Sequence, residues 1–143
     1  MSIGGFDALF KPKTLALVAG ADEPGQIARV LARNLAEGGF KGKMLAVHPS
    51  KRELAGRKAV RTIADLPEAP DLGVICAPPA AVPALIAALA ERGARAAVVL
   101  PHAIGADRGD GTAVRAAIDA AASRHRLHLI GPGSLGILVP SIG

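Results

Sequence analysis

The chain has 143 residues and a formal net charge of +5, from 17 Lys and Arg against 12 Asp and Glu. This length suits one domain with a substantial core. Trp and Tyr are absent and Phe occurs three times, so the core must be aliphatic, which favours an α/β domain over a β-sandwich. The near absence of stacking aromatics and of an Arg-rich helix argues against a nucleic-acid partner. The basic charge instead favours a small, phosphate-bearing molecule.

Cysteine content and hydropathy indicate the setting. Cys76 is the single cysteine, which excludes a disulfide framework or a Cys-based zinc site within one chain and favours a reducing, cytoplasmic compartment. Residues 1–13 lack the long apolar core of a signal peptide, and no apolar run reaches the length of a membrane span. We therefore predict a cytoplasmic domain without membrane association.

Strands and helices alternate from the N-terminus onward. Residues 14–19 (TLALVA) form a continuous apolar run, typical of a strand buried on both faces. Residues 25–38 predict a helix, with strands at 43–47 and, more weakly, at 58–60. The residues expected on the inner face of this helix are Ile27, Val30, Leu31 and Leu35.

The second half of the chain repeats the pattern. It predicts strands at 72–77, 96–100 and 127–130, and helices at 78–92 and 112–125. The residues expected to face inward are Val82, Leu85, Ile86 and Leu89 in the first of these helices and Val114, Ala117, Ile118 and Ala121 in the second.

Six strands with three interleaved helices predict a single α/β domain over residues 1–143. We expect a Rossmann-like, doubly wound and mainly parallel sheet with helices on both faces and the strand order 3-2-1-4-5-6. Ligands of such sheets bind at the carboxyl ends of the strands, near the switch point between strands one and four. The loops predicted to meet there are 20–26, 47–52, 77–80 and 101–105.

The turn after the first strand reads GADEPGQIA, residues 20–28. It is neither the GxGxxG fingerprint nor a P-loop. A glycine before a helix start still lets backbone N–H groups approach an anion, although Asp22 and Glu23 would have to point away. The alternative is a plain strand–helix turn. The candidate ligand-binding residues here are Gly20, Ala21, Asp22, Gly25 and Gln26.

The turn after the second strand reads HPSKR, residues 48–52. NAD-binding sheets commonly carry an acid near this point to bind the ribose, whereas a basic residue accommodates a ribose phosphate. Between residues 41 and 61 one acid, Glu53, stands against seven basic residues: Lys41, Lys43, Lys51, Arg52, Arg57, Lys58 and Arg61. This charge fits a phosphorylated ribose, on the 2′ oxygen in NADP or the 3′ oxygen in coenzyme A. The alternative is a solvated basic surface.

The segment APPAA, residues 77–81, follows the fourth strand. Proline has no N–H and a fixed φ, so the pair presents a rigid, apolar edge suited to an adenine or a pantetheine arm. The same prolines also suit a helix start.

No catalytic constellation is evident. The four histidines (His48, His102, His125 and His128) do not cluster as metal ligands do. Ser134 lies in GPGSLG, where Pro132 replaces the first glycine of a nucleophile elbow. Cys76 lies inside a predicted strand, as an inert core thiol would. We predict neither a catalytic residue nor a metal site in this domain.

Four segments, taken together, resemble a known family. They are LFKPKTLALVAGA (9–21), EGGFKGKMLAVHPSKRELAGRKAVRTIADLP (37–67), DLGVICAPPAAVP (71–83) and LIGPGSLGILVP (129–140). Their order and spacing resemble the CoA-binding domain of NDP-forming acyl-CoA synthetases, of the α subunit of succinyl-CoA synthetase and of multidomain protein acetyltransferases. The resemblance implies binding of CoA or acyl-CoA. It also implies an N-terminal piece of a larger protein, with further domains of the CoA-ligase, ATP-grasp or acetyltransferase type.

The resemblance also implies roles for individual residues. The turn 20–26 is similar to the family's phosphate-facing turn. His48, Pro49 and Lys51 match the VNP-x-K region that receives the adenosine end, with Lys51 as the phosphate partner. The remaining matches are Ala77, Pro78 and Pro79 in the wall along the nucleotide and Ile104 in a loop near the thiol end.

Two departures from the family pattern stand out. His48 replaces the usual Asn, and Gly133 and Ser134 replace the Asn and Cys of a GPNC segment near the reacting centre of the synthetases. The second departure bears on synthetase chemistry more than on CoA binding. Two other hypotheses stay open: an NADP- or NAD-binding oxidoreductase domain, and a ligand-sensing or scaffold domain without tight binding.

Overall fold

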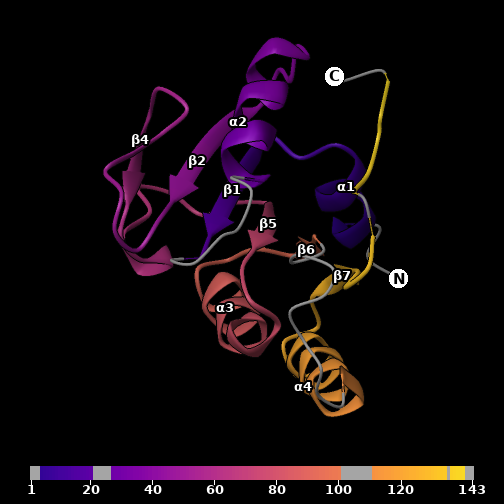
Figure 1. The fold of residues 1–143 in the computed structure, drawn as a ribbon. Coiled ribbons are helices and arrows are strands. Elements are labelled where there is room, and N and C mark those ends of the chain that lie inside the picture. The colour runs from indigo at the N-terminus through magenta and orange to yellow at the C-terminus, as the bar shows by residue number, and fades with distance from the viewer. Residues whose placement is uncertain (1–3, 21–26, 101–110, 135, 141–143) are drawn as a thin grey trace.

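The computed structural model describes residues 4–20, 27–100, 111–134 and 136–140 (Figure 1). Its α-helices are α1 (Gly4–Phe10), α2 (Ile27–Glu37), α3 (Val82–Glu91) and α4 (Gly111–Arg124). Its strands are β1 (Thr14–Ala19), β2 (Lys43–Val47), β3 (Glu53–Leu54), β4 (Arg57–Val60), β5 (Leu72–Cys76), β6 (Ala96–Val99) and β7 (His128–Ile130). Two short 3-10 helices are η2 (Ile63–Asp65) and η3 (Pro79–Ala81).

The strands form one sheet in the order β3-β4-β2-β1-β5-β6-β7. Every pairing is parallel except that of β3 with β4. The predicted order 3-2-1-4-5-6 is therefore confirmed, with β3 added as an antiparallel strand at one edge. Because β1 pairs with both β2 and β5, the switch point lies between β1 and β5.

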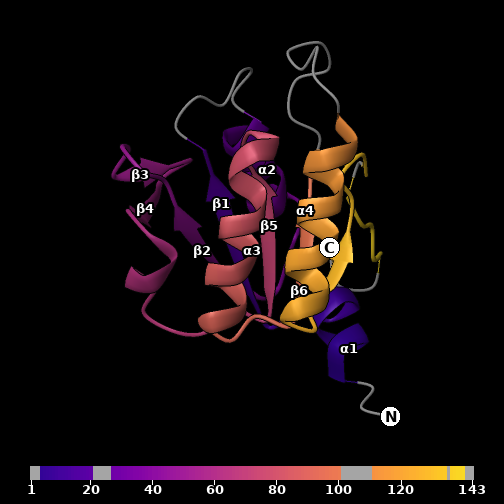
Figure 2. The ribbon, with the colours of Figure 1, turned by 90° about the horizontal axis from the view of Figure 1, so that it is seen from below.

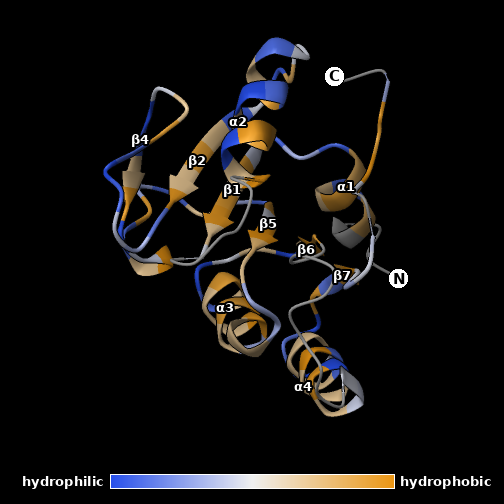
Figure 3. Ribbon diagram, viewed as in Figure 1, coloured by the Kyte–Doolittle hydropathy of each residue, from blue (hydrophilic) through white to orange (hydrophobic). Residues whose placement is uncertain are grey.

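Helices cover both faces of the sheet, as predicted. Figure 2 shows α3 and α4 side by side on one face, with α2 on the other. Alternate residues of β1 serve the two faces: Ala16 and Val18 pack in the cluster with α3 and α4, whereas Leu15 and Leu17 pack in the cluster with α1 and α2. The strands are consequently apolar on both sides, and Figure 3 shows this hydrophobic layer.

The inner faces of α2 and α4 differ in part from those predicted. Val30 of α2 is 43% exposed, while Ala28 and Ala32 are buried. In α4, Ala117 is exposed, and Ala122 is buried beside the predicted Ile118. Small side chains let a helix approach the sheet closely, so alanines rather than Val30 mark the contact line of α2.

Within the described residues, α1 and β3 are elements that the sequence did not predict. Helix α1 contacts β6 and β7, and its Ala8 and Leu9 are buried. Strand β3 is joined to β4 by Ala55 and Gly56, whose φ angles are 48° and 79°. Positive φ at both central residues matches the right-handed twist of the strands and permits this tight hairpin. No helix within the described ranges is long and apolar enough to cross a bilayer.

Asp71 joins the amino ends of the central strands, and its removal should destabilise the sheet. Its Oδ2 accepts hydrogen bonds from the backbone N–H groups of Lys13 at 2.8 Å and Thr14 at 3.0 Å. Because Asp71→Ala leaves both donors without this acceptor, we expect the free energy of unfolding to fall by about 1–3 kcal/mol in denaturant titrations. Asp119→Ala is the control, since its ion pair with Arg115 is solvent-exposed and is worth about 0–1 kcal/mol. Equal losses in the two variants would contradict this assignment.

Candidate functional site

A cleft of about 490 Å³ opens at the carboxyl ends of β1, β2 and β5. This is the switch point at which open α/β sheets bind their ligands. Its floor comes from the last residues of β1 and β2, and its walls include Pro49 and Pro78. Among the lining residues that the structure describes, Arg61 is the one ionisable side chain. The cleft is therefore suited to a ligand with an apolar body and an anionic edge.

Gly20 brings bare backbone to the floor of the cleft. Its N–H donates to the carbonyl oxygen of Cys76 at 2.8 Å, which extends the pairing of β1 with β5 by one residue. A Cβ at this position would lie 2.9 Å from Cδ of Pro78 and 3.1 Å from Cα of Ala77. Glycine is thus required for the close approach of the two chain segments, and the predicted placement of Gly20 in the site is consistent with the cleft.

The two prolines after β5 divide the carboxyl edge of the sheet into two hollows. Ala77 and Pro78 line the main cleft, whereas Pro79 lines a second hollow of about 200 Å³. Ala77 borders both hollows. The other residues of the second hollow are Val82, Val99, Leu100, Ile118, Pro132 and Gly133. The segment predicted to form a rigid apolar edge, residues 77–79, thus lies between the main cleft and the second hollow and lines both.

The turn after β2 is closed by His48, which is 2% exposed. Its backbone N–H donates to the carbonyl oxygen of Val60 at 2.9 Å. Its Nδ1 accepts hydrogen bonds from the backbone N–H groups of Ser50 at 3.2 Å and Lys51 at 3.1 Å. An Nδ1 atom that accepts carries no proton, so the imidazole is the neutral Nε2–H tautomer. Of the residues in this turn, Pro49 lines the cleft.

Two cations lie next to cleft-lining residues in the sequence. Lys51 is two residues after Pro49, and Arg61 directly precedes Thr62. Lys51 is exposed and is not among the residues that line the cleft. Arg61, at the carboxyl end of β4, does line it. In the sequence, Arg61 is one of seven basic residues between positions 41 and 61 and is not among the predicted site residues. The available signal was its position directly after a predicted parallel strand, since such positions share one edge of the sheet.

Thr62 forms part of the cleft rim and is held by Asp65. Its hydroxyl donates to Oδ2 of Asp65 at 2.8 Å, and its backbone N–H donates to the same oxygen at 3.2 Å. These two bonds fix the start of η2 beside Arg61. Thr62 is absent from the residues predicted for the site, although the Thr-x-x-Asp spacing of Thr62 and Asp65 is the sequence signal of a capped helix start.

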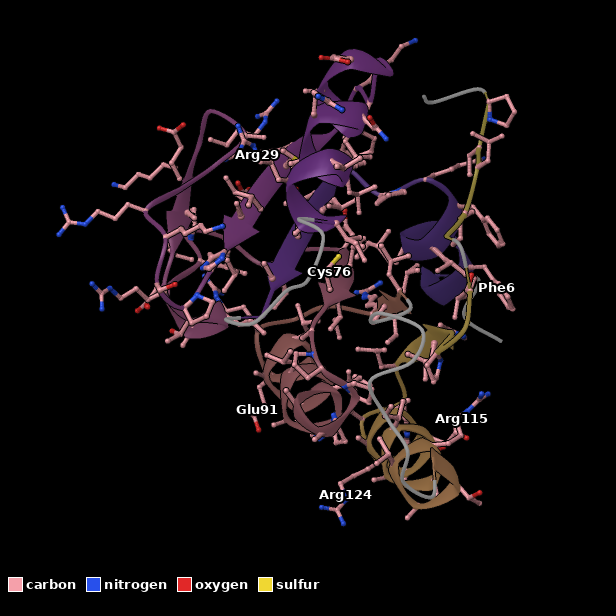
Figure 4. The ribbon with its side chains drawn as sticks, in the orientation of Figure 1. Phe6, Arg29, Cys76, Glu91, Arg115 and Arg124 are labelled. Atoms are coloured by element: carbon pink, nitrogen blue, oxygen red, sulfur yellow. The ribbon has the colours of Figure 1, made fainter. Side chains whose placement is uncertain are left out.

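Five predicted site residues lie outside the described residues: Ala21, Asp22, Gly25, Gln26 and Ile104. The structure therefore brings together Gly20, Pro49, Ala77 and Pro78 around one cleft. It places Pro79 in the second hollow and His48 in the interior. Cys76 is 4% exposed, and Figure 4 shows it within the sheet, in agreement with the predicted core thiol.

Comparison with known proteins connects this architecture to one family. Residues 13–140 match the family model described as a CoA binding domain. The chain is 27% identical over 130 residues to an ADP-forming acetate–CoA ligase of Archaeoglobus fulgidus, covering 91% of this chain and 19% of that protein. It is 26% identical over 136 residues to the α subunit of an ADP-forming acetate–CoA ligase of Pyrococcus furiosus, covering 92% of this chain and 29% of the subunit.

A solved structure agrees with these matches. It is a dinucleotide-forming acetyl-coenzyme A synthetase of Candidatus Korarchaeum cryptofilum in complex with phosphate and ADP. The TM-score is 0.82 at 26% identity, over 98% of this chain and 30% of that chain. The chain therefore spans less than a third of the length of these relatives. Because the family model matches nearly its whole length, the chain belongs to the family of CoA-binding domains found in ADP-forming acyl-CoA synthetases.

Proposed function

We propose that the cleft binds the adenosine end of CoA. The observation that supports this most directly is the composition of the cleft: its described lining is aliphatic except for Thr62 and the single cation Arg61. An adenine can lie between apolar walls such as Pro49 and Pro78, and a cation at the rim can pair with a phosphate. The position of the cleft at the switch point, in a chain of the CoA-binding family, supports the same assignment.

The second hollow is the proposed path of the pantetheine arm. It adjoins the main cleft at Ala77, and most of its described lining is aliphatic. It also includes Pro132 and Gly133 of the GPGS segment, which corresponds to the family's GPNC segment near the reacting thiol. An arm that leaves the main cleft over Ala77 would direct its thiol toward Gly133. Acyl-CoA would follow the same path, with its acyl group beyond the thiol.

Lys51 and Arg61 are the proposed partners of the 3′-phosphate of CoA. They follow β2 and β4, which are neighbouring parallel strands, so both lie at the carboxyl edge of the sheet. A charge-assisted hydrogen bond contributes about 1.5–3 kcal/mol, and solvent exposure lowers this value. We therefore expect Lys51→Ala or Arg61→Ala to weaken CoA binding about tenfold in titration calorimetry, at about 1.4 kcal/mol per tenfold change.

The ligand panel for this experiment separates the alternatives. Binding of 3′-dephospho-CoA should change less than about twofold in either variant, because the contacted phosphate is absent. Arg115→Ala is the matched control, since Arg115 is exposed on α4 and pairs with Asp119. Equal losses for CoA and dephospho-CoA would contradict the phosphate contact. Tighter binding of NADPH than of CoA to the unaltered domain would overturn the proposed function in favour of a nicotinamide-binding domain.

The parent protein is proposed to join this domain to others that carry out the chemistry. The relatives are ADP-forming CoA ligases several times longer than the matched region, and we infer further domains of the CoA-ligase or ATP-grasp type. An acetyltransferase domain is the alternative partner. Assaying the product of the full gene for ATP-dependent CoA thioester formation, and separately for transfer of an acetyl group from acetyl-CoA to a protein lysine, distinguishes the two.

A further inference from the structure

We propose that His48 is a positioning residue, which supplies the hydrogen-bond acceptor of an asparagine and thereby sets Pro49 and Lys51 for coenzyme binding. This inference rests on the proposed CoA-binding function of the cleft. His48 is the one buried polar side chain of the described core. It does not line the cleft, and it stands where the family's motif usually has asparagine.

The covalent structure of the two side chains explains the exchange. In histidine, Nδ1 is two bonds from Cβ, and in asparagine Oδ1 is also two bonds from Cβ. Both atoms can therefore accept hydrogen bonds from the backbone N–H groups two and three residues ahead, as asparagine does in an Asx turn. In this chain those donors are Ser50 at 3.2 Å and Lys51 at 3.1 Å.

Two consecutive backbone amides of the turn share one side-chain acceptor. Pro49 has no N–H, so Ser50 and Lys51 supply the first two amide donors after His48, and both donate to the same Nδ1 atom. The backbone N–H of His48 itself is bonded to Val60 of the neighbouring strand. The turn is thus fixed to the sheet at one end and closed by the imidazole at the other.

Two residues of this closed turn are proposed contacts of the ligand. Pro49 lines the cleft, and Lys51 is the proposed phosphate partner at the point where the turn closes. Loss of the acceptor would free two amides and allow Pro49 and Lys51 to move relative to the cleft. Displacements of about 1 Å at such a site are enough to weaken binding strongly.

A matched pair of amide variants tests the position of the acceptor. His48→Asn places an amide oxygen two bonds from Cβ, as Nδ1 is, whereas His48→Gln places it three bonds away, nearer the position of Nε2. We expect His48→Asn to bind CoA within about fivefold of the wild-type domain and His48→Gln to bind it at least tenfold more weakly. The preference for CoA over 3′-dephospho-CoA should fall in His48→Gln alone, because Lys51 is then misplaced.

Two further measurements accompany the binding data. Denaturant titrations show whether each variant is folded, and amide hydrogen exchange at Ser50 and Lys51 should be faster in His48→Gln than in His48→Asn. If His48→Gln does not fold, His48→Asn decides alone, and a loss of CoA affinity greater than fivefold overturns the proposal. Unchanged CoA preference in a folded His48→Gln also overturns it. In either case, CoA binding by the wild-type domain would still support the proposed function. If the wild-type domain does not bind CoA, both the proposed function and the role of His48 are refuted.

Discussion

Replacing Gly20 by valine is expected to reduce CoA affinity by at least tenfold. A Cβ at this position meets Cδ of Pro78 at 2.9 Å and Cα of Ala77 at 3.1 Å, so the end of β1 must move away from the turn after β5. The two further methyl groups of valine would occupy the cleft floor itself. A cost of about 1–3 kcal/mol from overpacking is expected in addition, and denaturant titrations measure it separately.

Gly111→Val is the matched control for this experiment. Among the described residues, a Cβ on Gly111 meets nothing within 4 Å, so the same side chain is added without a steric conflict there, and Gly111 is not among the residues that line the cleft. Titration calorimetry should give the wild-type affinity for this variant. If Gly20→Val bound CoA as tightly as Gly111→Val, the cleft at the carboxyl ends of β1 and β5 would not be the coenzyme site.

Gly131→Ala is expected to produce the largest loss of stability. Gly131 has φ +92°, a conformation that side chains other than glycine rarely adopt, and an added Cβ would collide with the carbonyl oxygen of Val99 at the end of β6. Backbone strain costs about 1–3 kcal/mol, and relief of the collision requires β6 or the GPGS segment to move. We expect the free energy of unfolding to fall by about 2–4 kcal/mol in total.

Gly133→Ala separates the two contributions. Gly133 has nearly the same φ, +93°, but a Cβ there meets no atom of the described part of the chain within 4 Å. Its loss should therefore reflect backbone strain alone, about 1–2 kcal/mol. If the two variants lost equal stability, the contact with Val99 would make no contribution and the close packing of this segment on β6 would be unimportant.

Long apolar runs made the central sheet predictable. Strands β1 and β2 occupy the predicted residues because TLALVA and KMLAV are buried on both faces and bounded by turns. By contrast, α1 is seven residues long with two glycines at its start, and a helix this short depends on tertiary packing rather than propensity. The two residues of β3 depend on a hairpin in which Ala55 has φ 48°, which alanine does not favour.

Site residues that directly follow a strand can be predicted from the sequence. Site residues that reach the cleft only through strand pairing are harder to predict. Gly20, Pro49 and Pro78 are predictable because each lies in a turn directly after a predicted strand, and all three line the cleft. The family motif points to Lys51 as the phosphate partner and does not include Arg61. Arg61 reaches the cleft wall because β4 pairs with β2. The sequence alone does not show whether a long side chain such as that of Arg61 extends into a cleft.

The proposed role of His48 would also limit which substitutions position 48 accepts. Codons for histidine, asparagine and aspartate differ only at their first base, and all three side chains place an acceptor two bonds from Cβ, so alternative ways of closing the turn are a single substitution apart. Codons for glutamine and leucine are equally near to those for histidine, yet neither residue supplies an acceptor two bonds from Cβ. Selection at this position would then act on where one acceptor atom lies, and a chemically conservative exchange such as histidine to glutamine would be the harmful one.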